Sequence, residues 1–466
     1  MTAPDGRPED APAAPRRVDP VGAELARVEA ALAARWPESK IVPTTARIRS
    51  LLELLGNPQA TYPVIHLTGT NGKTSTARMV DALLRAFGVR VGRMTSPHLV
   101  SVTERIAVDG EAIAAEEFVR SYDELAPYLH LVDQGQDVPL VYFEVLTAMG
   151  YAAFADAPVE VAVVEVGLGG RWDATNVADG QVSVITPVEY DHTALLGGTL
   201  AEIATEKAGI IKPAATAILA AQPPEVLPVL LAQAAEVGAS VARQGLEFGV
   251  ADRRIGVGGQ QLRLRGLAGE YDEVFLPLHG AFQAQNAACA LAAVEAFFGR
   301  GGSTGRLDPE LVREGFAAVR SPGRLEVVRT APTVLLDAAH NPAGMTATAA
   351  AVGEAFGFRR LVAVVATLAD KDVRGMLVAL EPVVDEVVVT ENRSYRRLPA
   401  DELAAIAVAV FGAGRVTVEL RLDDAIEAAI RLAEEGGTNH PLGGAGVLVT
   451  GSVVTAGEAR TLLGAR

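Results

Sequence analysis

A glycine-rich segment of the sequence has the residue types needed to hold phosphate groups. In HLTGTNGKTSTARM, residues 66–79, a glycine turn is followed directly by Lys73 and Thr74. The preceding apolar run predicts a buried strand, and the apolar spacing after Thr74 predicts an amphipathic helix. Backbone N–H groups at a helix N-terminus attract anions, a lysine can reach terminal phosphates, and a threonine hydroxyl can meet Mg²⁺. The sequence therefore predicts an ATP site formed by Thr70, Asn71, Gly72, Lys73 and Thr74.

The spacing of this loop departs from the GxxxxGK[ST] pattern, because Leu67 stands where that pattern has its first glycine. The loop is of a shorter type. A Gly-Lys-Thr turn can also cap a helix without any ligand. The succession of strand, loop and helix favours the phosphate site over this alternative.

Two further strands end in residues that can bind a metal ion. Glu165 ends the run VEVAVVE and is followed by a loop with three glycines, and His192 follows the run VSVITPV together with Asp191. Because parallel strands end at the same edge of a sheet, Glu165 and His192 are predicted to hold Mg²⁺ or Mn²⁺. The alternatives are that Glu165 caps a turn and that His192 is an ordinary turn residue. Ser96, at the end of a third strand, adds an oxygen donor at the same edge.

Lysine is scarce in this chain, which draws attention to the lysines it has. Of 41 Lys plus Arg, five are lysines, so most surface cations are arginines. Lys207 lies on a predicted helix, and neither Glu202 nor Glu206 stands three or four residues away to pair with it. A solvated surface lysine is one interpretation. The other is that an ammonium group, or an amine able to lose its proton, is needed at this position.

The second half of the sequence offers a weaker set of polar residues. Asn286 lies near a helix start, where it can contact an adenine edge or cap the helix, and Arg324 follows a Ser-Pro-Gly turn. Asp337 and His340 end a strand just before a helix, which is a site for an anionic group. Ser452 follows the last strand. Each of these residues alone is weak evidence, but together they predict one shared crevice.

The elements that must position these residues predict an α/β protein. Residues 62–220 alternate β-branched runs with helical segments, as in a mostly parallel sheet of the P-loop type, and residues 241–277 predict antiparallel hairpins at one edge. A second series of strands and helices, residues 333–452, predicts a smaller Rossmann-like, doubly wound sheet, preceded by a Pro-Gly hinge at 321–328. The predicted domains are a flexible arm (1–20), an ATP-binding domain (21–321) and a C-terminal domain (322–466), with ligands between the last two.

Composition excludes several classes of function. A formal charge of −16 argues against a nucleic-acid partner, which requires a basic surface. The apolar runs are too short for the roughly 20 residues that cross a bilayer, and the N-terminal arm lacks the apolar core of a secretion signal. The single cysteine, Cys289, is expected in a helix core. A soluble cytoplasmic protein is expected.

Several motifs together resemble one enzyme family. TGTNGKT is shared by the Mur-type ATP-dependent amide ligases, whereas SPHLVSVTERI, YFEVLTAM, EVGLGGRWDATN, DHTALLG with EKAG, and LDAAHNP resemble the folylpolyglutamate synthase/dihydrofolate synthase branch. The likeness covers about residues 40 to 460. It implies that ATP phosphorylates a carboxylate of a pterin-bearing substrate, and that L-glutamate then attacks the acyl phosphate. The implied partners are these small molecules, with no nucleic acid, no membrane and a monomeric chain.

The resemblance also implies roles for individual residues. The implied catalytic residues are Lys73, Lys207 and His192. The implied ligands of two Mg²⁺ ions are Ser96, Glu165, His192, Thr74 and a carbamylated Lys207. The implied ATP contacts beyond the loop are Asn286, Arg324 and Asp337. The residues implied near glutamate are His340 and Ser452. The implied pterin contacts are Val42, Pro43, Phe143, Trp172, Asp173 and Ala174.

The chain departs from the family pattern at a few positions. Phe282 replaces a histidine in GAFQAQN, Trp172 stands where leucine is usual, and Val453 and Val454 follow the terminal Gly-Ser in place of bulkier residues. Two other functions are weighed against the folate ligase. A ligase of peptidoglycan precursors is disfavoured because 60 N-terminal residues are too few for a UDP-binding domain. A P-loop switch that binds a partner protein is disfavoured by the second α/β domain.

Overall fold

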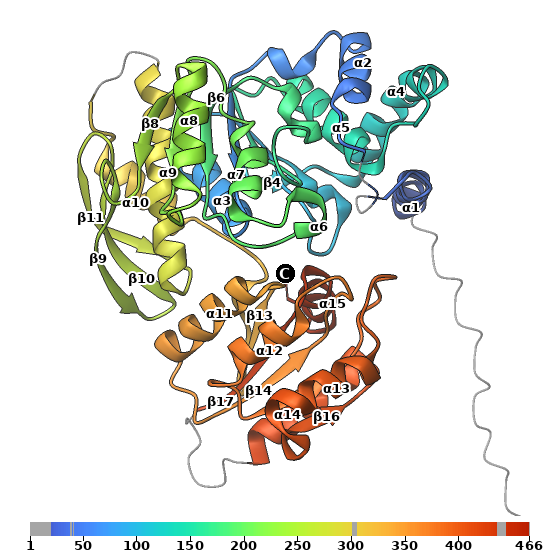
Figure 1. Ribbon diagram of the computed structural model, residues 1–466, viewed down its shortest axis with the longest axis vertical. Coiled ribbons are helices and arrows are strands. Elements are labelled where there is room, and N and C mark those ends of the chain that lie inside the picture. The colour runs from blue at the N-terminus through green and yellow to red at the C-terminus, as the bar shows by residue number, and fades with distance from the viewer. Residues whose placement is uncertain (1–19, 38–39, 41, 301–304, 436–443, 466) are drawn as a thin grey trace, which may run out of the picture.

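The computed structural model describes residues 20–37, 40, 42–300, 305–435 and 444–465. The predicted flexible arm, residues 1–20, lies outside this part of the chain except for Pro20, where the first helix begins. The described residues form a larger N-terminal part and a smaller C-terminal part that face each other (Figure 1). No helix among them is long and apolar enough to cross a membrane.

The N-terminal part is built on an eight-stranded sheet in the order β4-β3-β2-β5-β1-β6-β7-β8. The six strands from β2 to β8 are parallel, and β3 and β4 add an antiparallel edge. Valine and isoleucine fill the central strands because both faces of the sheet are covered. The strands are β1 (Val64–Thr68), β2 (Val91–Met94), β3 (Ile106–Val108), β4 (Glu111–Ala112), β5 (Val161–Glu165), β6 (Gly180–Ile185), β7 (Thr216–Leu219) and β8 (Ser240–Arg243).

Helices cover both faces of this sheet. One core joins the sheet to α3, α9 and α10, and a second joins it to α1, α2, α4 and α5. The helices are α1 (Pro20–Ala33), α2 (Ala46–Leu54), α3 (Lys73–Ala86), α4 (Ala115–Gln134), α5 (Tyr142–Asp156), α6 (Thr193–Leu196), α7 (Leu200–Ala208), α8 (Leu227–Val237), α9 (Ala281–Arg300) and α10 (Pro309–Ala317). Short 3-10 turns are η1 (Pro58–Ala60), η2 (Val102–Arg105), η3 (Ala174–Val177) and, in the C-terminal part, η4 (Ala413–Arg415).

The predicted antiparallel hairpins exist, but not at the edge of the main sheet. They form a separate three-stranded sheet, in the order β11-β10-β9, whose alternate apolar residues such as Leu262 and Leu264 pack into the core shared with α9. Its strands are β9 (Gly249–Gly256), β10 (Gly259–Arg265) and β11 (Glu270–Leu276). The edge position is taken instead by β8, which was included in the predicted hairpins and is parallel to β7.

The C-terminal part is a six-stranded sheet in the order β12-β13-β17-β14-β15-β16, parallel except for β12. The predicted doubly wound arrangement is confirmed, because α11, α12 and α13 pack on one face and α14 and α15 on the other. The strands are β12 (Arg324–Thr330), β13 (Thr333–Asp337), β14 (Arg360–Val365), β15 (Glu386–Val389), β16 (Val416–Val418) and β17 (Ala445–Thr450). The helices are α11 (Pro342–Ala355), α12 (Val373–Leu380), α13 (Ala400–Phe411), α14 (Leu422–Glu435) and α15 (Val453–Leu462).

The predicted Pro-Gly hinge at residues 321–328 is wrong over most of its length. From Arg324 the chain pairs with β13 as the antiparallel strand β12, and Leu325 is buried in the C-terminal core. The turn before it remains, with Gly323 at a φ of 67°. The predicted domain boundary at 321/322 stays a prediction.

The two parts of the molecule touch closely where α15 meets the loop after β2. A Cβ atom built on Gly457 of α15 would lie 1.9 Å from the carbonyl oxygen of Leu99. No other residue type fits this contact without moving α15 away from the loop. Gly457 therefore sets how near the C-terminal part approaches the N-terminal sheet.

Replacing Gly457 by alanine is expected to lower the free energy of unfolding by about 1–3 kcal/mol, as an overpacked contact does. Gly353, in the exposed face of α11, is the matched control, since a Cβ there meets no atom within 4 Å. Gly353→Ala should be neutral or stabilising by up to about 1 kcal/mol through helix propensity. Chemical denaturation measures both, and equal stability of the two variants would contradict the close contact.

Candidate functional site

A cleft lies between the two parts, at the carboxyl ends of β1, β5, β6 and β13. It encloses about 1590 Å³, which includes space open to solvent. Parallel sheets place their ligands at this edge. The predicted residues that line the cleft are Thr70, Asn71, Gly72, Lys73, Thr74, Ser96, Glu165, His192, Lys207, Asn286, Arg324, Asp337 and His340.

The glycine-rich loop is pressed between β6 and α9. Gly69 has a φ of 147°, and a Cβ there would lie 1.8 Å from the Thr186 hydroxyl oxygen. Gly72 has a φ of 89°, and its Cβ would lie 2.6 Å from Oδ1 of Asn286. These contacts explain why glycine is needed at both positions. They also hold the loop so that α3 begins at Lys73, with the N-terminus of this helix directed at the cleft.

Two lysines from distant segments meet at one main-chain oxygen of this loop. The Lys73 ammonium donates to the carbonyls of Gly69 and Thr70, each at 3.1 Å, and Lys207 donates to Gly69 at 2.7 Å. Burial, and then the charge of Lys73, lower the pKa of Lys207 to about 7. The interpretation of Lys207 as a surface lysine is therefore wrong, since its side chain is buried in the cleft wall.

A buried carboxylate lies near Lys73. Glu165 accepts hydrogen bonds from the Thr74 hydroxyl at 2.8 and 3.0 Å, and from the backbone N–H of Ser96 at 3.3 Å. Burial raises the pKa of Glu165, and the charge of Lys73 opposes that shift. Glu165 thus does not cap its own turn, because its partners come from α3 and from the loop after β2.

His192 and His340 approach each other from the two parts of the molecule. His192 has a φ of 51° and precedes α6, so the turn predicted there exists as well. Burial lowers the pKa of each imidazole to about 4. Both rings are therefore neutral at pH 7, the form in which a histidine can bind a metal ion.

Asp191 joins these histidines to the C-terminal part. Its carboxylate accepts from Lys371 at 2.8 Å and from Asn341 at 3.2 Å, and it lies 3.7 Å from Nε2 of His340 and 3.9 Å from Nε2 of His192. Burial would raise the pKa of Asp191, but its basic neighbours hold it well below the usual range. At pH 7, where the histidines are neutral, Lys371 is the lysine that donates directly to this carboxylate.

The sequence places Asp191 at a strand end but predicts no role for it, and it predicts none for Asn341 or Lys371. The scarcity of lysine was a usable signal for Lys371, which precedes α12. No comparable signal marked Asn341, since its side chain also caps α11.

Asn286 and Asp337, two of the predicted ATP contacts, have different hydrogen-bond partners. Asn286 lies inside α9 rather than at its start, so a capping role is wrong, and its amide donates to Gln283 at 3.1 Å. Asp337 accepts from the backbone of Leu325 and Ala339 and from the hydroxyl of Thr348. It therefore ties β12 to β13 at the cleft wall.

The remaining predicted contacts do not line the cleft. Phe143 and Asp173 lie directly behind Gly167, where a Cβ would be 2.6 Å from the Phe143 ring and 3.2 Å from Oδ2 of Asp173. Trp172 packs in the core of α7 and α8. Ser452 caps α15 through the Thr455 N–H. Ala174 is buried in η3, and Val42 and Pro43 lie before α2.

A magnesium ion can be tested against this donor set. The described residues contain no group of three or more His, Cys, Asp or Glu side chains able to hold a metal ion. Mg²⁺, however, commonly takes one or two carboxylates together with substrate phosphates and water. Glu165 with the Thr74 hydroxyl, placed at the glycine-rich loop, fits this mode of binding.

Comparison with known proteins places the chain among folate-related ligases. Residues 144–294 match the Mur ligase middle domain, and residues 323–453 match the Mur ligase glutamate ligase domain. The chain is 53% identical over 460 residues to a dihydrofolate synthase/folylpolyglutamate synthase of Mycobacterium tuberculosis, covering 95% of this chain and 94% of that protein. It is 34% identical to a folylpolyglutamate synthase of Lacticaseibacillus casei, covering 90% and 94%.

Solved structures give the same result. The fold matches the folylpolyglutamate synthase of Mycobacterium tuberculosis complexed with ADP and AMPPCP, with a TM-score of 0.91, 52% identity, and 96% and 99% of the two chains covered. The enzyme of Thermotoga maritima matches with a TM-score of 0.81 and 30% identity, covering 95% and 97%. With identity above half over nearly its full length, this chain belongs to the dihydrofolate synthase/folylpolyglutamate synthase family of Mur-type ligases.

Proposed function

We propose that this protein is an ATP-dependent ligase that adds L-glutamate to dihydropteroate and to folate monoglutamates or polyglutamates. The observation that carries the proposal is the convergence of Lys73 and Lys207 on the loop carbonyl of Gly69, opposite the pair formed by Glu165 and Thr74. This is a phosphate-handling centre in a cleft between two α/β sheets. The names of the relatives supply the substrate class.

The reaction proceeds in two displacements. A carboxylate oxygen of the pterin substrate attacks the γ-phosphorus of ATP, the bond from that phosphorus to the bridging oxygen breaks, and ADP and an acyl phosphate form. The amine of L-glutamate then attacks the acyl carbon, the C–N bond forms, and inorganic phosphate leaves as the amine loses a proton. Most of the catalytic effect is positioning and neutralisation of charge on the phosphoryl oxygens.

The residues of the cleft have matching roles in this proposal. Thr70 to Gly72 would bind the phosphates through backbone N–H groups, and Lys73 would leave the loop carbonyls to meet the terminal phosphate. Asn286, Arg324 and Asp337 would contact the rest of ATP. His340 on the C-terminal side, together with Lys371, would face the carboxylates of glutamate.

Divalent cations would neutralise phosphate charge in this site. Glu165, Ser96 and Thr74 would hold one Mg²⁺, and His192 with a carbamylated Lys207 would hold a second. Carbamylation requires a neutral amine and converts it into a carboxylate-like ligand. The buried position of Lys207 supports this assignment, because burial lowers its pKa and so favours the neutral amine. An arginine at this position would stay charged at any relevant pH and could not be carbamylated.

The pterin would contact residues around the loop after β5. Phe143, Trp172, Asp173 and Ala174 lie in or behind the loop after β5, next to Gly167 of the cleft wall, and Val42 and Pro43 precede α2. Together they would bind the pterin beside the cleft, where it would reach the cleft past Gly167. We also propose that residues 21–321 and 322–466 are separate domains. The chain would act as a monomer.

Substrate omission tests the proposed function. Phosphate release is expected only when ATP, Mg²⁺, dihydropteroate or folate, and L-glutamate are all present, because neither displacement can be completed without its acceptor. Mass spectrometry of the product separates a glutamylated pterin from a peptidoglycan precursor. Hydrolysis that requires no pterin, or that a protein partner accelerates, would contradict the proposal.

Lys207→Ala is expected to lose most turnover, by roughly 100-fold or more, if the residue supplies a metal ligand, while the protein remains folded.

Carbamylation is followed separately with ¹³C-labelled bicarbonate by NMR. The carbamate signal should grow as the pH rises through about 7, where the Lys207 amine loses its proton. Lys212→Arg should keep the signal, since Lys212 lies outside the cleft lining. A signal that persists in Lys207→Arg would assign the carbamate to another amine.

Glu165→Gln keeps the shape of the side chain and its contact with Thr74 but removes the negative charge. Turnover at saturating ATP should fall by about 10- to 100-fold, with partial recovery at high Mg²⁺ if a metal contact is lost. Titration of activity with MgCl₂ makes the measurement. An unchanged Mg²⁺ requirement in this variant would show that Glu165 does not hold the ion.

A further inference from the structure

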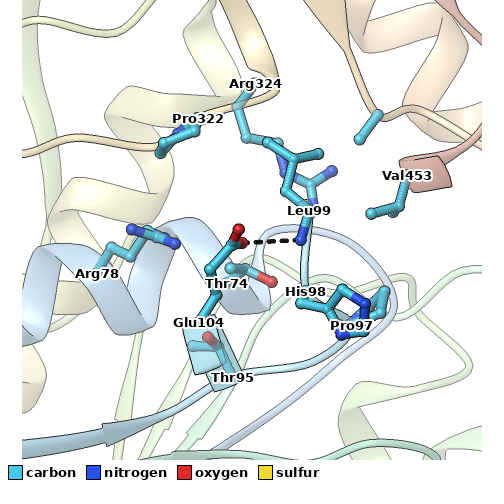
Figure 2. A pocket seen from close by; sticks show the side chains of 11 residues that line it. Thr74, Arg78, Thr95, Pro97, His98, Leu99, Glu104, Pro322, Arg324 and Val453 are labelled. Carbon is cyan, nitrogen blue, oxygen red and sulfur yellow. Dashed lines mark hydrogen bonds between the residues drawn. The ribbon is translucent and has the colours of Figure 1, made fainter. Parts of the chain in front are cut away.

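A second, smaller cavity opens beside the cleft, behind Thr74 (Figure 2). It encloses about 380 Å³ including open space, against about 1590 Å³ for the main cleft. Thr74, Pro97, Arg324 and Val453 line both cavities, so the two are neighbours. This side pocket has room for a small ion or a single functional group, but not for a nucleotide.

Two guanidinium groups face the side pocket from opposite sides of the domain junction. Arg78 lies one turn after Thr74 on α3, and Arg324 begins β12 (Figure 2). Within the described part of the chain, neither guanidinium forms a hydrogen bond or an ion pair. The other buried or partly buried arginines there do have such partners; for example, Arg47 pairs with Glu144 and Arg93 with Asp81. Burial, and then the charge of Arg93, lower the pKa of Arg78 to about 10, so its charge persists at pH 7.

Two other polar side chains of the pocket, Glu104 and His98, are already engaged. The Glu104 carboxylate accepts from the backbone N–H groups of Leu99, Val100 and Ser101 at 2.8 to 2.9 Å. Nδ1 of His98 accepts from Nε of Arg105 at 3.0 Å. The donors that remain are those of two cations and the Thr95 hydroxyl, opposed by the Glu104 carboxylate. This arrangement suits a small oxyanion.

We propose that Arg78 and Arg324 form a subsite for inorganic phosphate, which receives the product anion after it leaves the acyl carbon. The inference rests on the proposed function, since that reaction releases phosphate in the cleft. Thr74 lines both cavities and lies one helical turn from Arg78, so the glycine-rich loop and Arg78 are close in the fold. Arg324 lines both cavities and is therefore able to contact the anion on either side.

Direct binding tests the subsite without any turnover. Inorganic phosphate is titrated into the full-length protein saturated with ADP and Mg²⁺, and the affinity is measured by isothermal titration calorimetry. Loss of charge-assisted hydrogen bonds in Arg78→Met should weaken phosphate binding by about tenfold or more. Arg374→Met is the matched control, because Arg374 is exposed on α12 and lines neither cavity, and it should bind phosphate as the unaltered protein does.

Parallel titrations decide between sources of the oxyanion and between outcomes. Glutarate replaces phosphate in one arm, since a carboxylate of a glutamate tail has similar chemistry; binding of glutarate in preference to phosphate would overturn the proposal. So would equal phosphate affinity in Arg78→Met, or no phosphate binding to the unaltered protein.

Thermal unfolding and ADP affinity of Arg78→Met show that it is folded, and Arg78→Lys should recover part of the binding. If the substrate-omission assay fails while phosphate still binds through Arg78, the phosphate subsite stands, and its role in product release falls together with the proposed reaction.

Discussion

The carbonyl oxygen of Gly69 accepts hydrogen bonds from the side-chain nitrogens of two lysines, and the rest of the site depends on this contact. Two buried cations repel each other, and their desolvation costs free energy unless other groups compensate. Here the compensation comes from the loop carbonyls and from the nearby carboxylates of Glu165 and Asp191. A polyanionic ligand in the cleft would add further negative charge to compensate these cations, so a site of this kind favours ATP.

A second constraint is that half of the site belongs to each part of the molecule. Asp191 follows β6 but finds its closest partner, Lys371, in the C-terminal part. The amide of Asn341 reaches Asn71 of the glycine-rich loop as well. Together with the close approach of Gly457 to Leu99, these contacts define a junction that the cleft and the smaller pocket of Arg78 share. Motion at this junction would change both cavities at once.

Much of the architecture could be predicted from the sequence, because parallel strands buried on both faces leave continuous apolar runs. Both main sheets follow from that signal, and so does the convergence of Lys73, Glu165 and His192 on one edge. The antiparallel strand β12 was missed because Ser321 to Gly323 form a turn whose residues dominate the local pattern. The placement of β8 was wrong because a four-residue strand does not reveal its partner. Which strand pairs with which depends on contacts between residues that are far apart in the chain.

Individual side-chain partners were harder to predict than strand ends. Lys207 was open to a surface interpretation, since helical spacing says nothing about a loop 138 residues away that buries it. Asn286 was expected at a helix start, but α9 begins five residues earlier, at Ala281. The links between Asp191, Asn341 and Lys371 join segments from two sheets. No local pattern specifies them, because they arise only when the two sheets are docked.

Lys73 is the residue that would meet the terminal phosphate of ATP, and the other proposed roles depend on this contact. Calorimetric affinities for AMPPCP and for AMP, measured with the unaltered protein and with Lys73→Met, test this directly. We expect the variant to bind AMPPCP about tenfold or more weakly while its affinity for AMP stays the same, because only the first ligand carries the phosphates that the ammonium would contact. Equal losses for both ligands, or no loss for either, would contradict the claim.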